Sequence, residues 1–319
     1  MGVNLMIKQL LQSMVLTGLL PAILLSAVSE KISAEYAEPP PGMESPGAYR
    51  ITVLNDQGEL EPMELEEYIT RVVLGEVSSD FHLEALKAQA VAARTYTLYC
   101  IEVLQKHSGG AVCTDYHCCQ AYREPAVYLE GGGSDRGLER IRMAVNDTAG
   151  QVLHYDQKLI CATYFASSGG QTEDASEVWG KRYPYLRSVE SPGEEACGYF
   201  SEQVTMTPQE LQAALGVELS GAPKSWFGMV TDTVGGGVDL MRIGGRLYTG
   251  VELRKLLKLR STVFTITCMD DRIIIDTKGY GHRVGMSQHG ANAMAKEGQG
   301  YRTILDHYYT GTNLYQLES

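Results

Sequence analysis

Apolar residues recur at helical spacing between residues 65 and 104. The first set falls on one helix face, because residues three or four apart are neighbours there. It consists of Leu65, Tyr68, Ile69, Val72 and Val73. Gly75 can end this helix. Asp80 is a suitable N-cap for a longer, alanine-rich helix whose apolar positions continue to Leu104. The pattern therefore predicts two consecutive helices.

Strand-like patterns occur on both sides of these helices. Residues 51–55 are expected to form a strand, residues 151–167 a strand pair that turns at Asp156 and Gln157, and residues 261–279 a hairpin. Shorter helices are expected at 138–148, 207–215 and 251–259, and from about Ser287. Since helices and strands are mixed and no internal repeat occurs, the predicted fold class is mixed α+β.

The N-terminal segment has a different composition. From Leu10 to Val28 the chain is apolar and uncharged, with Lys8 before it, which fits a transmembrane helix. We expect an uncleaved, single-pass anchor in the cell membrane with the rest of the chain extracytoplasmic; a cleaved signal peptide is the alternative. The expected boundaries are 1–31 for a cytoplasmic stub and anchor, 32–48 for a proline-rich spacer, and 49–319 for a two-lobed folded region with a smaller lobe at about 198–262.

The charge balance excludes one class of partner. The chain has 27 Lys and Arg against 39 Asp and Glu, a net charge of −12, whereas binding to nucleic-acid phosphates requires clustered positive charge. No nucleic-acid partner is expected. The 19 tyrosines suit stacking on sugars, although half-buried packing also accounts for them.

Glu76 is the candidate acid. It follows an apolar helical turn, where the helix dipole and partial burial both disfavour the charged carboxylate and raise its pKa. A general acid at neutral pH needs such a shift. The alternative is a solvated carboxylate at a helix end. No second carboxyl lies at a convincing spacing, and Glu84 is expected to cap the next helix.

Polar residues in three other segments could contact a polar ligand. They are Lys87, Gln89, Arg94 and Tyr96 on the alanine-rich helix, Ser167, Ser168, Gln171 and Glu173 in SSGGQTE, and His282, Ser287 and Gln288 in GHRVGMSQ. Glycines beside them allow close approach of backbone to a ligand. Helix-surface charges and polar turns are the alternatives. A Ser–His nucleophile pair is disfavoured because no G-x-S-x-G elbow is present.

Cysteine and histidine gather in KHSGGAVCTDYHCCQAY, which holds His107, Cys113, His117, Cys118 and Cys119. Thiolate and imidazole groups this close in sequence suit a tetrahedral zinc site, catalytic with three protein ligands or structural with four. Free or disulfide-bonded cysteines are the alternative, since the spacing is looser than in a C-x-x-C pair.

Three ordered blocks resemble a known family. They are YITRVVLGEVSSDFHLEALKAQAVAARTYTLY at 68–99, ATYFASSGGQTEDASEVWG with PYLRSVESP at 162–192, and GHRVGMSQHGANAMA with ILDHYYTG at 281–311. The chain beyond the spacer resembles the family of stage II sporulation protein D, the SpoIID/LytB domain, over nearly its whole length. Arg283 and His289 depart from the usual GHGVGMSQYG of the family and are expected at the cleft rim.

The resemblance implies a lytic transglycosylase that cleaves peptide-stripped peptidoglycan glycan strands to 1,6-anhydromuramic ends during septal thinning and engulfment in sporulation. It implies Glu76 as the single general acid and base, and His107, Cys113 and Cys119 as zinc ligands, with His117 or Cys118 as a fourth. We expect the polar residues above to contact this substrate. The resemblance also implies that a membrane-anchored amidase and other engulfment proteins are partners.

Two other functions stay open. The amidase-enhancer branch of the superfamily shares this domain, so a non-catalytic glycan-binding module is the main alternative. A zinc hydrolase would use the Cys/His cluster as its catalyst, but the H-E-x-x-H arrangement of zinc peptidases is missing.

Overall fold

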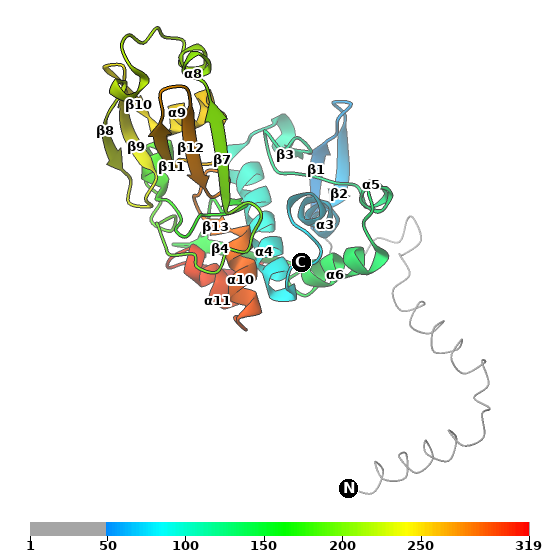
Figure 1. Ribbon diagram of the computed structural model, residues 1–319. Helices are drawn as coiled ribbons and strands as arrows, with labels where there is room; N and C mark the ends of the chain where they lie inside the picture. Colours follow the sequence, from blue (N-terminus) through cyan, green and yellow to red (C-terminus); the bar gives the residue numbers. More distant parts are fainter. Residues whose placement is uncertain (1–48, 319) are drawn as a thin grey trace, which may run out of the picture. The chain divides into compact units, whose positions relative to one another are not determined.

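The alanine-rich segment forms the centre of the larger hydrophobic core. In the computed structural model, which describes residues 49–318, it is helix α4 (Leu83–Leu98). Ala88, Ala90 and Ala93 are fully buried, and such small side chains let other helices approach from several sides. The helices that pack against α4 (Figure 1) are α3 (Leu65–Glu76), α6 (Asp135–Asn146), α10 (Gln288–Lys296) and α11 (Tyr301–Tyr308).

The ends of α3 and α4 differ from the prediction. Gly75 does not end α3, which continues to Glu76. The N-cap of α4 is His82, whose Nδ1 accepts a hydrogen bond from the Glu84 amide at 3.3 Å. Asp80 is not the cap, because residues 78–81 form a separate turn in which the Phe81 amide donates to the Ser78 carbonyl. After Leu98 the chain continues as the π-helical segment η1 (Tyr99–Leu104).

Three small sheets border the larger core. One has the order β2-β1-β3, from β1 (Arg50–Leu54), β2 (Leu60–Glu64) and β3 (Ala111–Cys113). The second has the order β14-β4-β5, from β4 (Gln151–Tyr155), β5 (Lys158–Leu159) and β14 (Asn313–Gln316). The third joins β6 (Tyr164–Phe165) in parallel to β13 (Met286–Ser287). This last pairing brings two of the candidate site segments together.

The expected strand pair at 151–167 is only partly correct. β4 and β5 do turn at Asp156 and Gln157, both of which have positive φ. The second strand ends after two residues, however, and Tyr164 and Phe165 pair with β13 instead.

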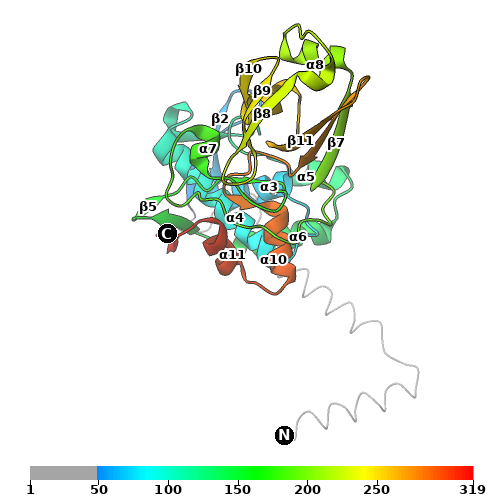
Figure 2. The same cartoon turned by 60° about the vertical axis from the view of Figure 1, so that its left-hand side comes forward.

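A second hydrophobic cluster draws on residues from Val204 to Ile275. Its two sheets have the orders β11-β12-β7 and β10-β9-β8. In Figure 2, strands β8, β9 and β10 lie beside one another in the upper part of the view. The elements are β7 (Ser201–Met206), α8 (Pro208–Leu215), η3 (Pro223–Ser225), β8 (Phe227–Asp232), β9 (Val238–Ile243), β10 (Arg246–Thr249), α9 (Gly250–Leu256), β11 (Val263–Cys268) and β12 (Ile273–Lys278). Thr207 and Thr249 form capping boxes at the starts of α8 and α9.

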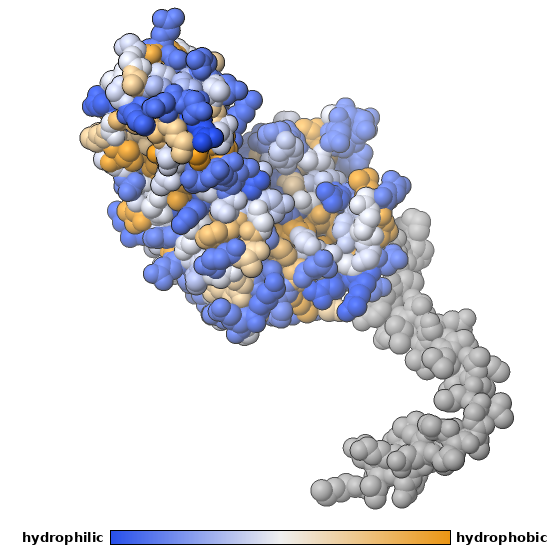
Figure 3. All heavy atoms as spheres, in the orientation of Figure 1, coloured by the Kyte–Doolittle hydropathy of each residue, from blue (hydrophilic) through white to orange (hydrophobic). Residues whose placement is uncertain are grey.

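Three short helices complete the described elements: η2 (Ser108–Gly110), α5 (Pro125–Glu130) and α7 (Ala175–Trp179). Helices and strands are thus intermixed, and the predicted α+β class is confirmed. Apolar and polar side chains alternate over the face seen in Figure 3, with the apolar ones in several small patches.

Residues from Tyr49 onward form one compact unit. Within residues 49–318, no helix is both long and apolar enough to cross a membrane. The anchor expected at 10–28 and the spacer expected at 32–48 lie outside the described residues.

Candidate active site

Glu76 is the last residue of α3, and two distant segments hold its carboxyl group. Oε1 accepts a hydrogen bond from the backbone amide of Ala121 at 2.8 Å. Oε2 accepts one from the side-chain amide of Gln288, the first residue of α10, at 3.3 Å. These contacts fix both carboxyl oxygens, as an acid that must meet a substrate in one geometry requires.

Gly75 makes the first of these contacts feasible. A Cβ atom at this position would lie 2.8 Å from the backbone nitrogen of Tyr122 and 2.9 Å from the backbone carbon of Ala121. Glycine therefore allows the loop to reach the end of α3. Gly75 was expected to end the helix; instead, its lack of a side chain lets the loop at Ala121 and Tyr122 approach and bind Glu76.

Burial is the main influence on the acidity of Glu76. It raises the pKa of the carboxyl group, while the hydrogen bonds from Ala121 and Gln288 favour the charged form and act in the opposite direction. The net direction is upward, as expected from the sequence. The cause is mainly desolvation.

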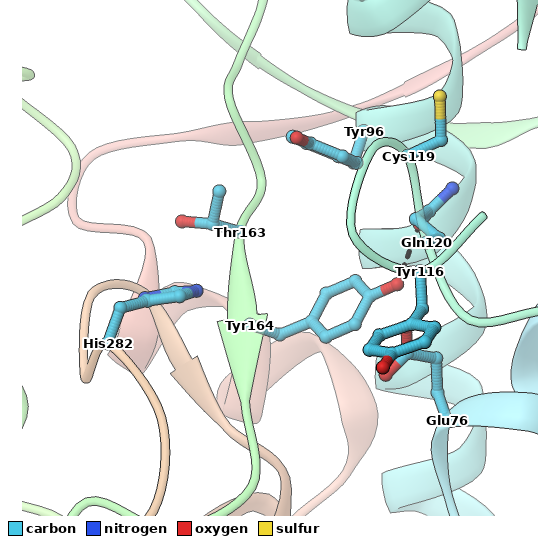
Figure 4. A pocket seen from close by; sticks show the side chains of 8 residues that line it. All are labelled: Glu76, Tyr96, Tyr116, Cys119, Gln120, Thr163, Tyr164 and His282. Carbon is cyan, nitrogen blue, oxygen red and sulfur yellow. Dashed lines mark hydrogen bonds between the residues drawn. The ribbon is translucent and has the colours of Figure 1, made fainter. Parts of the chain in front are cut away.

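A cavity of about 170 Å³ opens at Glu76 (Figure 4). Its lining residues are Glu76, Tyr96, Tyr116, Cys119, Gln120, Thr163, Tyr164 and His282. Among residues 49–318, Glu76 is the only carboxyl group in this lining. The cavity therefore offers one acid together with phenol, amide, hydroxyl and imidazole groups.

Tyr164 belongs to a short chain of hydrogen bonds across the cavity. Its hydroxyl donates to Oε1 of Gln120 at 2.7 Å (Figure 4), and Nε2 of Gln120 donates to the Thr97 hydroxyl at 2.8 Å. The phenol is thus held in place, with its oxygen close enough to influence Glu76.

His282 is a neutral group at neutral pH. Burial and the positive charge of Arg254 lower the pKa of its imidazole to about 4. Nδ1 accepts a hydrogen bond from the Val284 amide at 3.1 Å, so the proton of the neutral ring resides on Nε2. The ring contacts Phe165 and Trp179, with centroid separations of 5.6 and 5.4 Å.

The Cys/His cluster lies beside this cavity and shares Cys119 with it. The ligand atoms of His107, Cys113, Cys118 and Cys119 all lie within 4.8 Å of one another. Nε2 of His107 is 3.4 Å from Sγ of Cys118 and 3.5 Å from Sγ of Cys119. All three expected ligands are therefore brought together, and Cys118 is the fourth member.

His117 does not join the cluster. Its side chain is 72% exposed and lies 3.3 Å from an Asp115 carboxyl oxygen. Its ring lies against that of Tyr116, with the centroids 3.7 Å apart and the planes tilted by 36°. Of the two candidates for a fourth ligand, geometry favours Cys118.

Several residues expected to bind substrate are used by the fold instead. Arg94 is fully buried and bonds to Glu66, while Lys87 pairs with Glu84 at 3.1 Å and Asp147 at 3.0 Å. Gln89 is also buried, and its amide has no hydrogen-bond partner among the described residues. None of these three side chains lines the cavity. Of the four candidates on this helix, Tyr96 lines the cavity.

Ser167 and Ser168 are likewise fully buried. Their hydroxyls donate to Glu194 at 2.6 and 2.7 Å, and the Ser168 amide adds a third bond to the same carboxylate. Ser191 donates to Glu194 as well. The two serines therefore do not face a sugar, contrary to the expectation from the sequence. They belong to an internal hydrogen-bond network that satisfies the buried carboxylate of Glu194.

Glu173 and Arg283 form a buried ion pair with an Nη1–Oε2 distance of 3.6 Å, each side chain 1% exposed. Glu173 also accepts bonds from the Gly235 amide and the Thr233 hydroxyl. Both expectations here are wrong: Glu173 does not face a ligand, and Arg283 is not at a cleft rim. The pair connects the larger core to the β8–β9 loop.

The remaining candidates have mixed outcomes. Gln171 donates to Ser188 and to the Val234 carbonyl, and Ser287 is the buried N-cap of α10. Gln288 is near the cavity but contacts Glu76, so its direct role is to orient the acid. His289, the other departure from the family pattern, packs between Phe81 and Tyr199.

Sequence reasoning missed four residues of the cavity lining: Tyr116, Gln120, Thr163 and Tyr164. Two of them, Thr163 and Tyr164, lie within the block ATYFASSGG, but nothing in the local pattern distinguishes them from the buried serines nearby. The parallel pairing of β6 with β13 is what places Tyr164 at the cavity.

Fold and cavity together define an α+β protein that holds one partly buried carboxylic acid at a polar cavity, next to a Cys/His cluster. The model of the family described as "Stage II sporulation protein" matches residues 55–155. Stage II sporulation protein D of Bacillus subtilis (strain 168) is 37% identical, over 82% of this chain and 77% of the relative. The protein of the same name from Bacillus amyloliquefaciens is also 37% identical, over 82% and 76%.

The chain therefore belongs to the stage II sporulation protein D family. A more distant relative is the amidase enhancer of Bacillus subtilis (strain 168), which is 29% identical over 76% of this chain and 39% of the relative.

Proposed function

We propose that the chain is a lytic transglycosylase that cleaves peptide-stripped peptidoglycan glycan strands during septal thinning and engulfment in sporulation. The main support for the proposal is the environment of the Glu76 carboxyl group. It is the only carboxyl group lining the cavity, its pKa is raised by burial, and both of its oxygens are held by hydrogen bonds.

One carboxyl group suffices for this reaction. Protonated Glu76 donates its proton to the glycosidic oxygen as the bond from the anomeric carbon of muramic acid breaks. The resulting carboxylate then accepts the proton of the muramic 6-hydroxyl, whose oxygen attacks the same anomeric carbon. The products are a 1,6-anhydromuramic end and a new free hydroxyl, and no water is consumed.

A hydrolase would ordinarily need more. Two-carboxylate glycosidases use a second Asp or Glu to activate water or to attack the anomeric carbon. The cavity lining provides no such group. The single acid therefore favours internal attack by the substrate's own hydroxyl.

The test compares Glu76→Gln with Glu59→Gln, a matched change at an exposed position in the β1–β2 turn. We expect the purified wild-type chain and the Glu59 variant to release anhydromuramic ends from peptide-free glycan, detected by mass spectrometry. Glu76→Gln should be slower by about 10²- to 10⁴-fold, because general acid–base catalysis typically contributes that much. Full activity in Glu76→Gln would overturn the proposal.

The same variants test the main alternative, a non-catalytic glycan-binding module. The relative named amidase enhancer motivates it. An enhancer would stimulate an amidase equally well with Glu76→Gln and would form no anhydro product. Product formation that depends on Glu76 excludes it.

We also propose that His107, Cys113, Cys118 and Cys119 bind zinc. With Zn–S near 2.3 Å and Zn–N near 2.0–2.1 Å, a tetrahedral site should separate sulfur and nitrogen ligands by roughly 3.6 Å. The two Nε2–Sγ distances of 3.4 and 3.5 Å fit this value. The backbone amide of Cys113 donates to Sγ of Cys119, a contact that supports a thiolate ligand.

Four protein donors would occupy every position of a tetrahedral ion, so the proposed role of zinc is structural. The chain from Cys119 leads directly to Ala121, whose amide binds Glu76. Lys106 steadies the same loop through the Cys118 carbonyl. The cluster thus supports the backbone that positions the acid.

Metal analysis of the purified chain tests this site. We expect one zinc per chain in the wild type and in His117→Asn, and weaker retention against a chelator in Cys118→Ser. A wild-type chain without zinc, or loss of zinc in His117→Asn alone, would contradict the assignment.

The location and partners are proposals as well. We propose that the apolar run at 10–28 anchors the chain in the cell membrane, that the region from Tyr49 acts outside the cytoplasm at the sporulation septum, and that a membrane-anchored amidase supplies the stripped strands to the engulfment machinery. The apolar run and the family support this. Protease accessibility in sporangia freed of their wall should show cleavage of the folded region from the outside; full protection would contradict it.

A further inference from the structure

Arg254, in the last turn of α9, differs from three other buried or half-buried arginines. Arg94 pairs with Glu66, Arg260 with Glu202 and Arg283 with Glu173. The guanidinium of Arg254 makes no hydrogen bond, ion pair or cation–π contact with any residue from 49 to 318. Arg254 is partly exposed, so its positively charged guanidinium can be reached by a ligand.

An unpaired guanidinium in such surroundings is suited to an anion. Burial lowers the pKa of Arg254, which means that the charged group has lost hydration without gaining a partner. Its planar fork can donate two parallel hydrogen bonds to a carboxylate. A bound carboxylate would offset the cost of desolvation.

The backbone places Arg254 near Gly281, the residue before His282: the Leu259 amide donates to the Arg254 carbonyl at 2.9 Å, and the Gly281 amide donates to the Arg260 carbonyl at 3.0 Å. Arg254 is therefore close to His282 in the fold. The charge of Arg254 is one of the causes that lower the pKa of His282, and His282 lines the cavity at Glu76. The cation is therefore adjacent to the cavity wall formed by His282.

The same wall carries an exposed aromatic surface. Trp179 is 41% exposed, and its ring centroid lies 5.4 Å from that of His282. Tyr183 extends this surface, with its ring 6.5 Å from Trp179. Large aromatic faces beside a polar cavity suit the apolar face of a sugar ring.

We propose that Arg254, Trp179 and His282 form a subsite for muramic acid, in which Trp179 packs against the sugar and Arg254 pairs with the lactyl carboxylate. The inference rests on the proposed function and assigns a recognition element to it. While a stem peptide is attached, the lactyl group is a neutral amide; removal of the peptide exposes a carboxylate. Arg254 thus gives the enzyme a means to recognise strands that have been stripped.

The experiment separates the charge of the lactyl group from the bulk of a peptide. One substrate is peptide-free glycan with its free carboxylate, and the other is the same glycan with the carboxylate converted to a methylamide. The variants of the full chain are Arg254→Gln, Arg254→Lys and Lys255→Gln. Lys255 is the exposed neighbour on α9 and provides a matched loss of one positive charge.

We expect the wild type and Lys255→Gln to have a KM lower by about 10- to 100-fold for the carboxylate form, the range expected for hydrogen bonds to a charged group. Arg254→Gln should lose this preference, because its KM for the carboxylate form should rise to that for the methylamide form. Arg254→Lys should keep part of it, because the charge remains while the fork is lost. A preference that persists in Arg254→Gln would overturn the subsite.

A binding measurement distinguishes failure of the subsite from failure of the proposed reaction. Titration calorimetry with the Glu76→Gln chain should show tighter binding of the carboxylate form, and this advantage should disappear in Glu76→Gln/Arg254→Gln. Equal binding of both glycans by Glu76→Gln would refute the subsite. Absence of anhydro ends with the wild type, despite this selective binding, would refute the reaction and leave the subsite in place.

Discussion

Arg94 provides the sharpest contrast between a binding role and a structural role. The sequence places it among candidate substrate contacts, but its guanidinium joins three elements of the core. Nε lies 3.0 and 3.1 Å from the two carboxyl oxygens of Glu66 in α3, Nη1 donates to the Gln151 carbonyl in β4 at 3.1 Å, and Nη2 donates to the Val145 carbonyl in α6 at 3.3 Å. Arg94→Met removes all of these bonds and retains most of the side-chain volume.

The expected cost follows from these contacts. Removing one partner of a buried ion pair lowers the free energy of unfolding by roughly 3–5 kcal/mol. Glu66 is 30% exposed and can recover some hydration, so we expect a loss of about 3 kcal/mol. This loss is a large part of the free energy of unfolding of an ordinary domain, which is about 5–15 kcal/mol. A loss of about 3 kcal/mol should lower the melting temperature by about 6–12 °C.

Urea and thermal denaturation, followed by circular dichroism, measure this loss. Arg242→Met is the control, since Arg242 is exposed on β9 and donates only to the Gly245 carbonyl; it should change stability by less than about 0.5 kcal/mol. The double variant Glu66→Gln/Arg94→Met should lose less stability than the sum of the losses of the two single variants. Each single variant leaves one charged group without its partner, whereas the double variant removes both charges.

The reasoning is refuted if Arg94→Met has wild-type stability and an increased KM for glycan. That result would mean that Arg94 contacts the substrate and that the ion pair contributes little to folding. A stability loss shared equally by Arg242→Met would also refute it, since burial would then not be the cause.

Two further predictions concern the immediate surroundings of Glu76. If Glu76 acts as a proton donor, kcat/KM falls as the pH rises through the pKa of its carboxyl group. Gln288 donates a hydrogen bond to this group and favours its charged form, so Gln288→Leu should raise the pKa and move the alkaline limb of the kcat/KM profile to higher pH. An unchanged alkaline limb would contradict this role of the contact. Gly75→Ala would place a Cβ 2.8 Å from the Tyr122 backbone nitrogen, so it should lower stability by about 1–3 kcal/mol in thermal denaturation; a loss below about 0.5 kcal/mol would show that the loop can move aside freely.

Local patterns predicted many of the elements. Periodic apolar residues such as Leu65 and Val72 indicated α3, and Thr207 indicated the start of α8 through its capping box. These features depend on neighbours a few residues away, which the sequence displays directly. The N-cap of α4 was misassigned because Asp80 and His82 can both accept a bond from a helix amide, and only the turn at 78–81 decides between them.

The site was harder to predict because it is built from long-range contacts. Glu76 was found through its helix end and its family block, but its partners Ala121 and Gln288 lie 45 and 212 residues away. Ser167 was misjudged, since a serine in a glycine-rich turn looks accessible until Glu194 is placed beside it. Polar character alone does not distinguish a side chain that serves a ligand from one that satisfies a buried charge.

The bond from the backbone of Ala121 to Glu76 has a genetic consequence. Because the donor is a peptide N–H, exchanging the side chain at position 121 leaves it intact, and only proline would eliminate it directly. Point mutations can therefore alter this position over evolutionary time without removing the donor. Insertions or deletions between Cys119 and Ala121 would displace it at once, so selection here should act on loop length more than on residue identity.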